Sequence, residues 1–426
     1  MKATIAAVYL AALAEGTATG GRAKPSTPGS KTPKPGGKSF TLHQIENKNF
    51  KGHDGAKALM HAHMKYAQKL PDEVSKAVQS NPDLRIKLTA LTQEDGKTGT
   101  VQAKPAQHVD SEYSIIVDFG TPAQTIPLNL DTGSSDLWVF STDTDPSSVQ
   151  GQTLYRPDNS STSKRLSGET WKILYGDMAG ASGIVYTDKV QIGDTSVETQ
   201  AIEAALQVSA DIASDSFVSG IMGMANSAAN TVRPTPQRTY IDNIKDELAL
   251  PLFTANLRSR APGNYNFGYV NKSEHTGDIM YTQIDLTSPF WKISSSGYWI
   301  GKDEHVHAID SIVDTGTSLM LLPQSVVDNY YASINGSVLD PKLGMMLFPC
   351  DADVPDFWLS IGSYHGRLPA QYINYGPVNP KYCFGGIQTS RGLPFSVLGD
   401  VFLKAQFAVF DYGDAVVGLA NKDLGL

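Results

Sequence analysis

The clearest pattern in this chain is an apolar run that enters a short Asp-Thr-Gly loop and leaves it in a second apolar run. It occurs twice, as PLNLDTGSSDLWVF at residues 127–140 and as SIVDTGTSLMLL at residues 311–322. Apolar runs on both sides of a Gly-containing turn predict a strand, a tight loop and another strand. Asp131 and Asp314 are therefore expected at two loop tips with matched surroundings.

Short strand-like segments continue from residue 113 to the C-terminus, beginning with residues 113–119 and 125–130. Helical periodicity in this part of the chain is confined to short stretches, the clearest at residues 240–248 and 324–333. We therefore expect an all-β fold of two antiparallel lobes rather than a doubly wound parallel sheet.

A second repeated element indicates internal duplication. Residues 221–223 (IMG) end 92 positions after Asp131, and residues 397–399 (VLG) end 85 positions after Asp314. Each is an apolar strand that ends at Gly. The spacing predicts that each half supplies one Asp loop and one supporting strand, with a cleft between the halves.

The beginning of the chain has a different composition. Residues 1–20 combine an early Lys, an apolar run and small residues, which is typical of a secretory signal peptide. The alternative is an apolar helix of the mature protein. Residues 21–38 are rich in Gly, Pro, Ser, Thr and Lys, which predicts a flexible linker in which nothing packs.

The segment before residue 98 is also expected to be helical and basic. Helical spacing covers residues 56–67, Pro71 ends that helix, and residues 74–78 suggest another. Residues 21–97 carry 14 Lys and Arg against 7 Asp and Glu, a net charge of +7, whereas residues 98–426 carry 20 against 35, a net charge of −15. This asymmetry favours a basic partner for the acidic body over a nucleic-acid arm, because there is no run of like charges.

Paired carboxyl groups suit general acid/base catalysis. Two facing, buried Asp side chains cannot both ionise, so one holds a proton while the other activates a water. Gly133 and Gly316 let backbone N–H groups approach the carboxylates, and the hydroxyls of Ser134 and Thr317 can donate to them. A single such motif would be read as an ordinary β-turn. Two copies in matched apolar frames favour a catalytic pair.

These residues resemble the pepsin family of aspartic endopeptidases, in particular its secreted filamentous-fungal members. The resemblance covers residues 98–426 and implies a propeptide at residues 21–97, with residues 39–97 as its basic inhibitory part, followed by lobes at residues 98–270 and 271–426. It further implies a catalytic dyad and two Thr residues that join the two loops by hydrogen bonds: Asp131, Asp314, Thr132 and Thr315.

The resemblance also assigns a flap that closes over substrate. Tyr175, with Gly176 and Asp177, lies at the tip of an expected hairpin, and Trp138 matches the residue that supports this Tyr in the family. Met178 departs from the small residue that is common in relatives.

Lys65 and Tyr66 resemble the Lys-Tyr pair by which family propeptides block the dyad. On this interpretation the Lys65 ammonium holds both carboxylates ionised, and acidification leads to self-cleavage within residues 88–100. The alternative is that Lys65 is a solvated charge on a helix.

Cys350 and Cys383 are the only two cysteines, and an even count in an exported protein favours a disulfide over two free thiols. Asn159, Asn271 and Asn335 each begin an Asn-X-Ser sequon, which is either glycosylated or unused. The nine His residues are not accompanied by Cys or carboxylate residues at the spacing of metal ligands, and the sequence contains no phosphate-binding Gly loop. Neither a metal nor another cofactor is therefore expected.

The sequence therefore predicts a secreted, monomeric aspartic endopeptidase, made as a self-activating zymogen, that acts on proteins and peptides at acidic pH. The resemblance implies a preference for large hydrophobic residues at the cut. Neither nucleic acid nor membrane is expected as a partner. The alternative function is an inactive binding or inhibitor protein on the same fold, which the two intact Asp-Thr-Gly motifs argue against.

Overall fold

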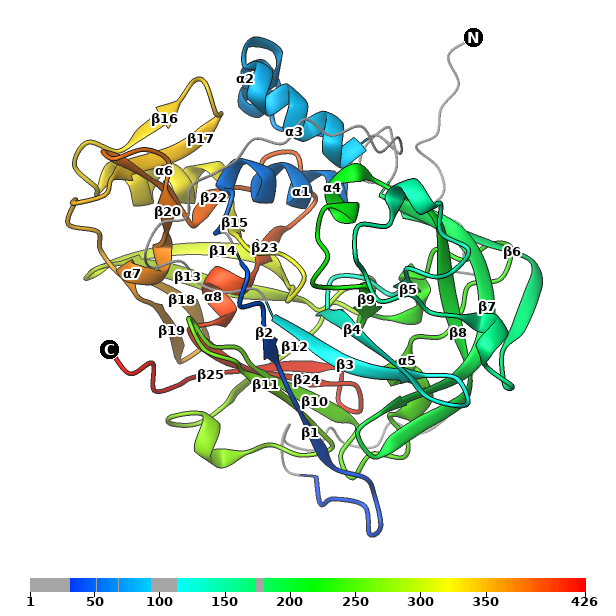
Figure 1. Cartoon of the computed structure of the whole chain (residues 1–426). Coiled ribbons are helices and arrows are strands. Elements are labelled where there is room, and N and C mark those ends of the chain that lie inside the picture. Colours follow the sequence, from blue (N-terminus) through cyan, green and yellow to red (C-terminus); the bar gives the residue numbers. More distant parts are fainter. Residues whose placement is uncertain (1–30, 51, 68, 93–112, 174–179) are drawn as a thin grey trace. The chain divides into compact units, whose positions relative to one another are not determined.

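The computed structural model describes residues 31–50, 52–67, 69–92, 113–173 and 180–426 (Figure 1). Strands predominate, and they form sheets of eight, seven, six and four strands. The predicted all-β, bilobal architecture is confirmed. Within these ranges, the helices are all too short or too polar to cross a membrane.

The first Asp-Thr-Gly loop joins two strands of the eight-stranded sheet. The strands around it follow the order β3 (Tyr113–Phe119), β4 (Gln124–Asp131), β9 (Gly220–Gly223), β5 (Leu137–Val139) and β8 (Thr195–Val208). Strand β9 lies between β4 and β5, parallel to the first and antiparallel to the second. The predicted supporting strand therefore lies directly beside the loop.

The second half repeats this arrangement in the seven-stranded sheet. The order is β13 (Lys292–Ile300), β14 (Asp303–Val313), β23 (Ser396–Leu398), β15 (Met320–Leu322) and β22 (Ile387–Thr389). Strand β23 again runs parallel to the strand before the loop and antiparallel to the strand after it. The matching pairings bear out the duplication that the sequence pattern indicated.

Glycine is required where each supporting strand passes its loop. A Cβ at Gly223 would lie 2.5 Å from the backbone nitrogen of Asp136, and a Cβ at Gly399 would collide with the carbonyl oxygen of Thr317. Because real Cβ atoms do not approach backbone so closely, only Gly allows the strands to support the loops at this distance.

A six-stranded sheet contains strands from both halves and one from the segment before residue 98 (Figure 1). Its order is β1 (Phe40–His43), β11 (Asn264–Phe267), β10 (Leu252–Asn256), β24 (Gln406–Asp411), β25 (Val416–Asn421) and β12 (Met280–Gln283). Phe40 of the edge strand stacks on Phe267 with a centroid distance of 4.8 Å. The N-terminal segment is thus built into the sheet that links the halves.

The remaining strands extend these sheets or form the four-stranded one: β2 (Ile45–Glu46), β6 (Lys164–Ile173), β7 (Ala181–Ile192), β16 (Val338–Asp340), β17 (Met345–Pro349), β18 (Phe357–Ile361), β19 (Tyr364–Leu368), β20 (Asn374–Pro377) and β21 (Tyr382–Gly385). A disulfide joins Cys350, just after β17, to Cys383 in β21. The predicted disulfide is confirmed.

Three helices precede the β region: α1 (Gly55–Ala67), α2 (Asp72–Ser80) and α3 (Pro82–Thr92). The first two agree with the periodicity, but α3 was not predicted. Of the later helices, α6 (Gln324–Ala332) agrees closely, whereas α5 (Tyr240–Ile244) is shorter than the expected residues 240–248. The other short helices are α4 (Ala210–Ala213), α7 (Ala370–Ile373) and α8 (Asp400–Leu403).

Residues 34–38, which were expected to pack against nothing, pair with the chain that follows α5. The backbone nitrogen of Lys38 donates to the Glu247 carbonyl at 2.9 Å, and the nitrogen of Ala249 donates back to the Lys38 carbonyl at 2.8 Å. The Lys38 ammonium also contacts the Glu247 carboxylate at 2.7 Å. The prediction that nothing packs was wrong here, because backbone hydrogen bonds need no apolar side chains.

Candidate active site

The two motif aspartates lie at the ends of equivalent strands. Asp131 is the last residue of β4, and Asp314 directly follows β14. Both are buried, with 2% and 0% of their surface exposed. Buried carboxyl groups need hydrogen-bond donors or a counter-charge, and both kinds of partner are present.

Each carboxylate accepts a hydrogen bond from the Gly two residues later in its own loop. The nitrogen of Gly133 donates to Asp131 Oδ1, and that of Gly316 donates to Asp314 Oδ1, both at 2.8 Å. The hydroxyl of Ser134 donates to Asp131 Oδ2 at 2.6 Å.

The second loop differs at the position equivalent to Ser134. The Thr317 hydroxyl is buried beside Asp314 and lowers its pKa. Among the described residues, however, it has no partner at hydrogen-bonding geometry. The predicted supporting hydroxyl is therefore in place, but it does not make the hydrogen bond that Ser134 makes.

Thr132 and Thr315 exchange hydrogen bonds between the loops. The Thr132 hydroxyl donates to the Val313 carbonyl at 2.8 Å, and the Thr315 hydroxyl donates to the Leu130 carbonyl at 2.7 Å. Each hydroxyl also accepts from the other Thr backbone nitrogen, at 3.1 Å and 2.9 Å. All four groups are buried, so each loop depends on the other for its polar partners.

The loops are so close that neither Gly could carry a side chain. A Cβ at Gly133 would collide with the carboxylate of Asp314, and a Cβ at Gly316 would collide with that of Asp131. Two carboxyl groups in such contact repel each other when both are ionised, which favours a single shared proton. This arrangement can take a proton from a water and deliver one to a carbonyl oxygen.

Lys65, near the C-terminal end of α1, inserts its ammonium between the two carboxylates. Its Nζ lies 3.0 and 3.1 Å from the oxygens of Asp131 and 3.4 and 3.3 Å from those of Asp314. Only 7% of the Lys65 side chain is exposed. Lys65 is therefore not a solvated charge on the surface of its helix.

Tyr66 occupies the space next to the dyad. Its hydroxyl donates to Asp314 Oδ2 at 2.6 Å. Its ring makes edge contacts with Phe290 and Phe395, at centroid distances of 5.6 and 5.2 Å. Burial, followed by the charge of Asp314, raises the pKa of Tyr66 well above its usual value, so the phenol remains a neutral donor.

The two aspartates have different proton affinities in this state. Burial raises the pKa of Asp131, and the Lys65 charge offsets this only in part. Burial also acts on Asp314, but the Lys65 charge and the hydrogen bonds to its carboxylate lower the pKa of Asp314 to about 2. The Lys65 charge therefore opposes the effect of burial at both carboxylates, and it outweighs that effect, together with the hydrogen bonds, at Asp314.

Comparison with known proteins agrees with this geometry. A family model described as "Eukaryotic aspartyl protease" matches residues 112–422. The chain belongs to this family. It is 41% identical to endothiapepsin of Cryphonectria parasitica over 399 residues, which cover 93% of each chain. It is 40% identical to aspergillopepsin-1 of Aspergillus oryzae and to penicillopepsin-3 of Penicillium janthinellum, with 90% of this chain and 93% of each relative covered. As an aspartic endopeptidase, it is a peptide-bond hydrolase.

In this aspartyl protease the flap assigned from sequence is described only at its base. Strands β6 and β7 pair antiparallel, as a hairpin requires, but Tyr175, Gly176, Asp177 and Met178 lie outside the described residues. Trp138 is buried and stacks on Trp171 of β6 at 6.0 Å. Its indole nitrogen has no hydrogen-bond partner among the described residues.

A second pair of buried carboxyl groups lies behind the first loop, and sequence reasoning missed it. Asp136 and Glu203 are 2% and 1% exposed. The amide of Asn230 donates to both, at 3.0 Å to Asp136 Oδ1 and 2.9 Å to Glu203 Oε1, and the Thr231 nitrogen donates to Asp136 at 2.7 Å. Burial raises the pKa of Asp136 to about 6. Burial and the neighbouring Asp136 charge raise that of Glu203 well above its usual range. The pair therefore retains a proton at acidic pH.

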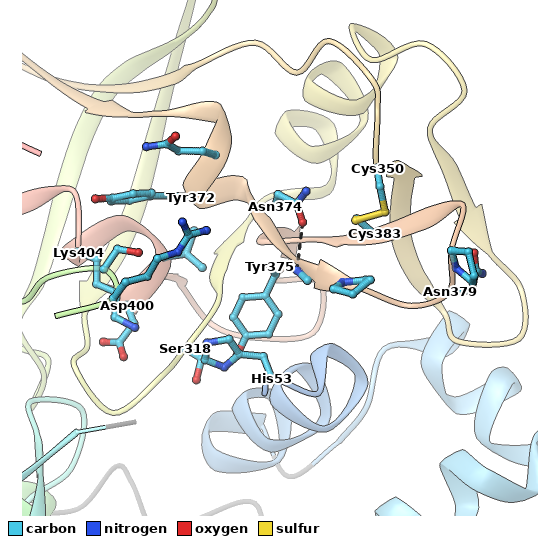
Figure 2. A pocket seen from close by; sticks show the side chains of 17 residues that line it. His53, Ser318, Cys350, Tyr372, Asn374, Tyr375, Asn379, Cys383, Asp400 and Lys404 are labelled. Atoms are coloured by element: carbon cyan, nitrogen blue, oxygen red, sulfur yellow. Dashed lines mark hydrogen bonds between the residues drawn. A yellow bond between two sulfur atoms is a disulfide. The ribbon is translucent and has the colours of Figure 1, made fainter. Parts of the chain in front are cut away.

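His53, just before α1, lines a cavity of about 480 Å³ next to the disulfide (Figure 2). His53 stacks on Tyr375 at a centroid distance of 4.4 Å, and Tyr372, Asp400 and Lys404 line other parts of the wall. The N-terminal segment thus contacts the second half at a place well before Lys65 in sequence. No local sequence signal indicated this contact.

Proposed function

We propose that this aspartyl protease is a secreted zymogen in which Asp131 and Asp314 form the catalytic dyad and residues 21–97 form an inhibitory propeptide. The observation that carries the proposal is the Lys65 ammonium, within 3.4 Å of both carboxylates in a buried site. An ammonium there excludes the water that the dyad would otherwise hold. The lobes are residues 98–270 and 271–426, and the enzyme acts as a monomer.

Once Lys65 leaves, a water takes its place between the carboxyl groups. The ionised Asp removes a proton from this water while the water oxygen attacks the peptide carbonyl carbon. The protonated Asp gives its proton to the carbonyl oxygen. The resulting diol collapses when the C–N bond breaks: the Asp that took the proton from water gives it to the nitrogen, and the other Asp takes a proton from a diol hydroxyl as the carbonyl forms again. No covalent enzyme intermediate forms, and the shared proton returns the dyad to its initial state, as is general for aspartic proteases.

Acid releases the propeptide because the two parts attract each other by opposite charge. The segment carries a net +7 and the body a net −15. Ion pairs join them at Lys38 with Glu247 and at Glu73 with Arg391. Protonation of carboxylates removes this attraction while Lys and Arg stay charged. Self-cleavage within residues 88–100 then makes the release permanent.

A preference for large hydrophobic residues at the cut is supported by the surroundings of Tyr66. Phe290 and Phe395 contact its ring beside the dyad. A substrate side chain that takes the place of the ring would bury apolar surface against the same two residues.

Asn159 and Asn335 are exposed, whereas the Asn271 side chain is bonded to Glu274 and Ser273. We therefore propose glycosylation at the two exposed sequons and less or none at Asn271. Mass spectrometry of tryptic glycopeptides, with and without N-glycosidase, measures the occupancy of each.

The test of the dyad is hydrolysis of casein at low pH by the activated wild-type protein and by Asp131→Asn and Asp314→Asn. Each substitution keeps the volume and removes one half of the shared-proton system, so both variants should be folded and inactive. Turnover within about tenfold of wild type, equivalent to roughly 1.4 kcal/mol of barrier, would falsify the dyad assignment. An inactive wild-type protein would instead point to a binding function on this fold.

The test of latency is the N-terminus and the activity of purified precursor as the pH is stepped from about 7 to about 3, across carboxylate titration. Lys65→Met keeps much of the side-chain length and removes the charge, so this variant should activate faster or at higher pH. Full activity of the intact wild-type precursor at neutral pH would contradict latency.

A further inference from the structure

His63 lies on α1 two residues before Lys65 and faces the body of the protein. It is fully buried, at 0% exposure, and belongs to the same buried helix face as Leu59 and Met60. The end of β22 lies against it, and its Nε2 is 2.9 Å from the carbonyl oxygen of Thr389. An imidazole is therefore enclosed between the inhibitory helix and the second half of the molecule.

The hydrogen bond fixes which nitrogen carries the proton. A carbonyl oxygen only accepts, so Nε2 of His63 must donate to Thr389, and in the neutral ring Nδ1 is then unprotonated. Nδ1 is buried and has no hydrogen-bond partner among the described residues. A second proton would place a buried N–H group and a positive charge where no acceptor is available, and both are unfavourable.

Charged groups on the elements around His63 pair with groups other than its ring. Arg391, in the turn after β22, pairs with Glu73 of α2 at 2.6 Å. Lys87 of α3 pairs with Asp54, just before α1, at 2.6 Å. On α1 itself the Lys65 ammonium is held by the dyad. None of these charges contributes to the pKa shift of His63, which has burial as its largest cause.

We propose that His63 is a proton-triggered release for the inhibitory helix: it is neutral while the helix is bound, and its protonation drives the helix off the body. This inference rests on the proposed function, because it concerns how the Lys65 contact is broken. It adds a trigger that acts at higher pH than the carboxylates, since a solvated His takes up its proton well before Asp and Glu do.

The sign and size of the effect follow from linkage. Burial lowers the pKa of His63 from 6.5 to about 4, which the Thr389 carbonyl opposes only in part. The bound helix therefore holds fewer protons than the released helix between these values, and binding weakens as the pH falls through this window. The expected weakening is about 30-fold at pH 5 and reaches about 300-fold well below pH 4.

The experiment compares the acid activation of full-length precursors carrying His63→Gln or His61→Gln with that of wild type. The amide introduced by His63→Gln keeps a donor for the Thr389 carbonyl but cannot gain a proton. His61→Gln is the matched control, because His61 is half-buried on the same helix. Activation rate constants are measured by loss of intact precursor at steps from about pH 6.5 to about pH 3.

We expect His63→Gln to activate up to about 30-fold more slowly at pH 5, with its activation midpoint moved to lower pH, and His61→Gln to resemble wild type. Equal rates for His63→Gln and wild type, or the same change in both variants, would overturn the proposal. Should His63→Gln not fold, His63→Leu keeps an apolar group at the site and is expected to show the same shift.

The fully processed enzymes separate this inference from the proposed function. After complete cleavage the propeptide is gone, so wild type and His63→Gln should hydrolyse casein equally. If the two processed enzymes are equally active and their precursors activate alike, only the proposal about His63 is refuted. If no processed protein has activity, the proposed function itself fails.

Discussion

The buried pair of Asp136 and Glu203 should set the upper pH limit for stability of the first half. The informative change is Glu203→Gln, which keeps the shape of the side chain and an acceptor for the Asn230 amide while removing one of the two acids. The change removes the proton that the raised pKa keeps on Glu203, whereas Asp136 stays buried and still accepts hydrogen bonds from Asn230 and Thr231.

The size of the effect follows from the pKa of Asp136, which burial raises from 3.8 to about 6. A raised carboxyl pKa means that the folded state binds more protons than the unfolded state between these values. Stability is therefore full below about pH 4 and falls as the pH rises through 6. A difference of about two pH units corresponds to about 3 kcal/mol, and both side chains are buried, so solvent screening does not reduce it greatly. Glu203 acts in the same direction.

The assay is the melting temperature between about pH 4 and about pH 7, measured in an Asp314→Asn background so that self-digestion does not interfere. The parent should lose on the order of 5 °C across this range through Asp136 and a further amount through Glu203, and Glu203→Gln should lose only the Asp136 share. The matched control is Glu198→Gln on the same strand, where the carboxylate is 65% exposed and pairs with Lys189 at 3.2 Å. Identical pH profiles for the two variants would show that Glu203 does not contribute to the pH limit of stability.

Replacing Cys350 and Cys383 with Ser should destabilise the protein by roughly 3 to 4 kcal/mol in the chain-entropy model and spare casein hydrolysis, and an unchanged melting temperature would refute this. Thr132→Val leaves a buried carbonyl and a buried N–H group unpaired. We expect the free energy of unfolding, measured in urea, to fall by about 1–3 kcal/mol per group, and kcat to be reduced. Phe395→Ala removes an aromatic contact worth about 0.5–1.5 kcal/mol, so activation should be faster and KM for substrates with large hydrophobic residues higher; equal KM would argue against this subsite.

The parts of the site that could be predicted are those with a local signature. An Asp-Thr-Gly loop between apolar runs is visible within about a dozen residues, because strand, turn and Gly requirements are all short-range. The resemblance of Lys65-Tyr66 to a propeptide pair was equally local, and the structure places both residues at the dyad. The disulfide could also be predicted, because two cysteines allow only one pairing.

The features that were missed depend on residues far apart in sequence. Glu203 meets Asp136 only because β8 pairs with β5. The carbonyl that holds His63 belongs to Thr389, 326 positions away. Helix α3 was missed for a different reason: Leu84 is its one fully buried apolar side chain among those described, so it lacks the stripe that reveals an amphipathic helix.

The crossed hydrogen bonds of Thr132 and Thr315 limit how far the two halves can change independently. Since each hydroxyl reaches the backbone of the opposite loop, neither loop has all its buried polar groups paired without the other. The two halves can therefore differ in surface and substrate contacts, but a change at either Thr leaves buried polar groups of both loops unpaired.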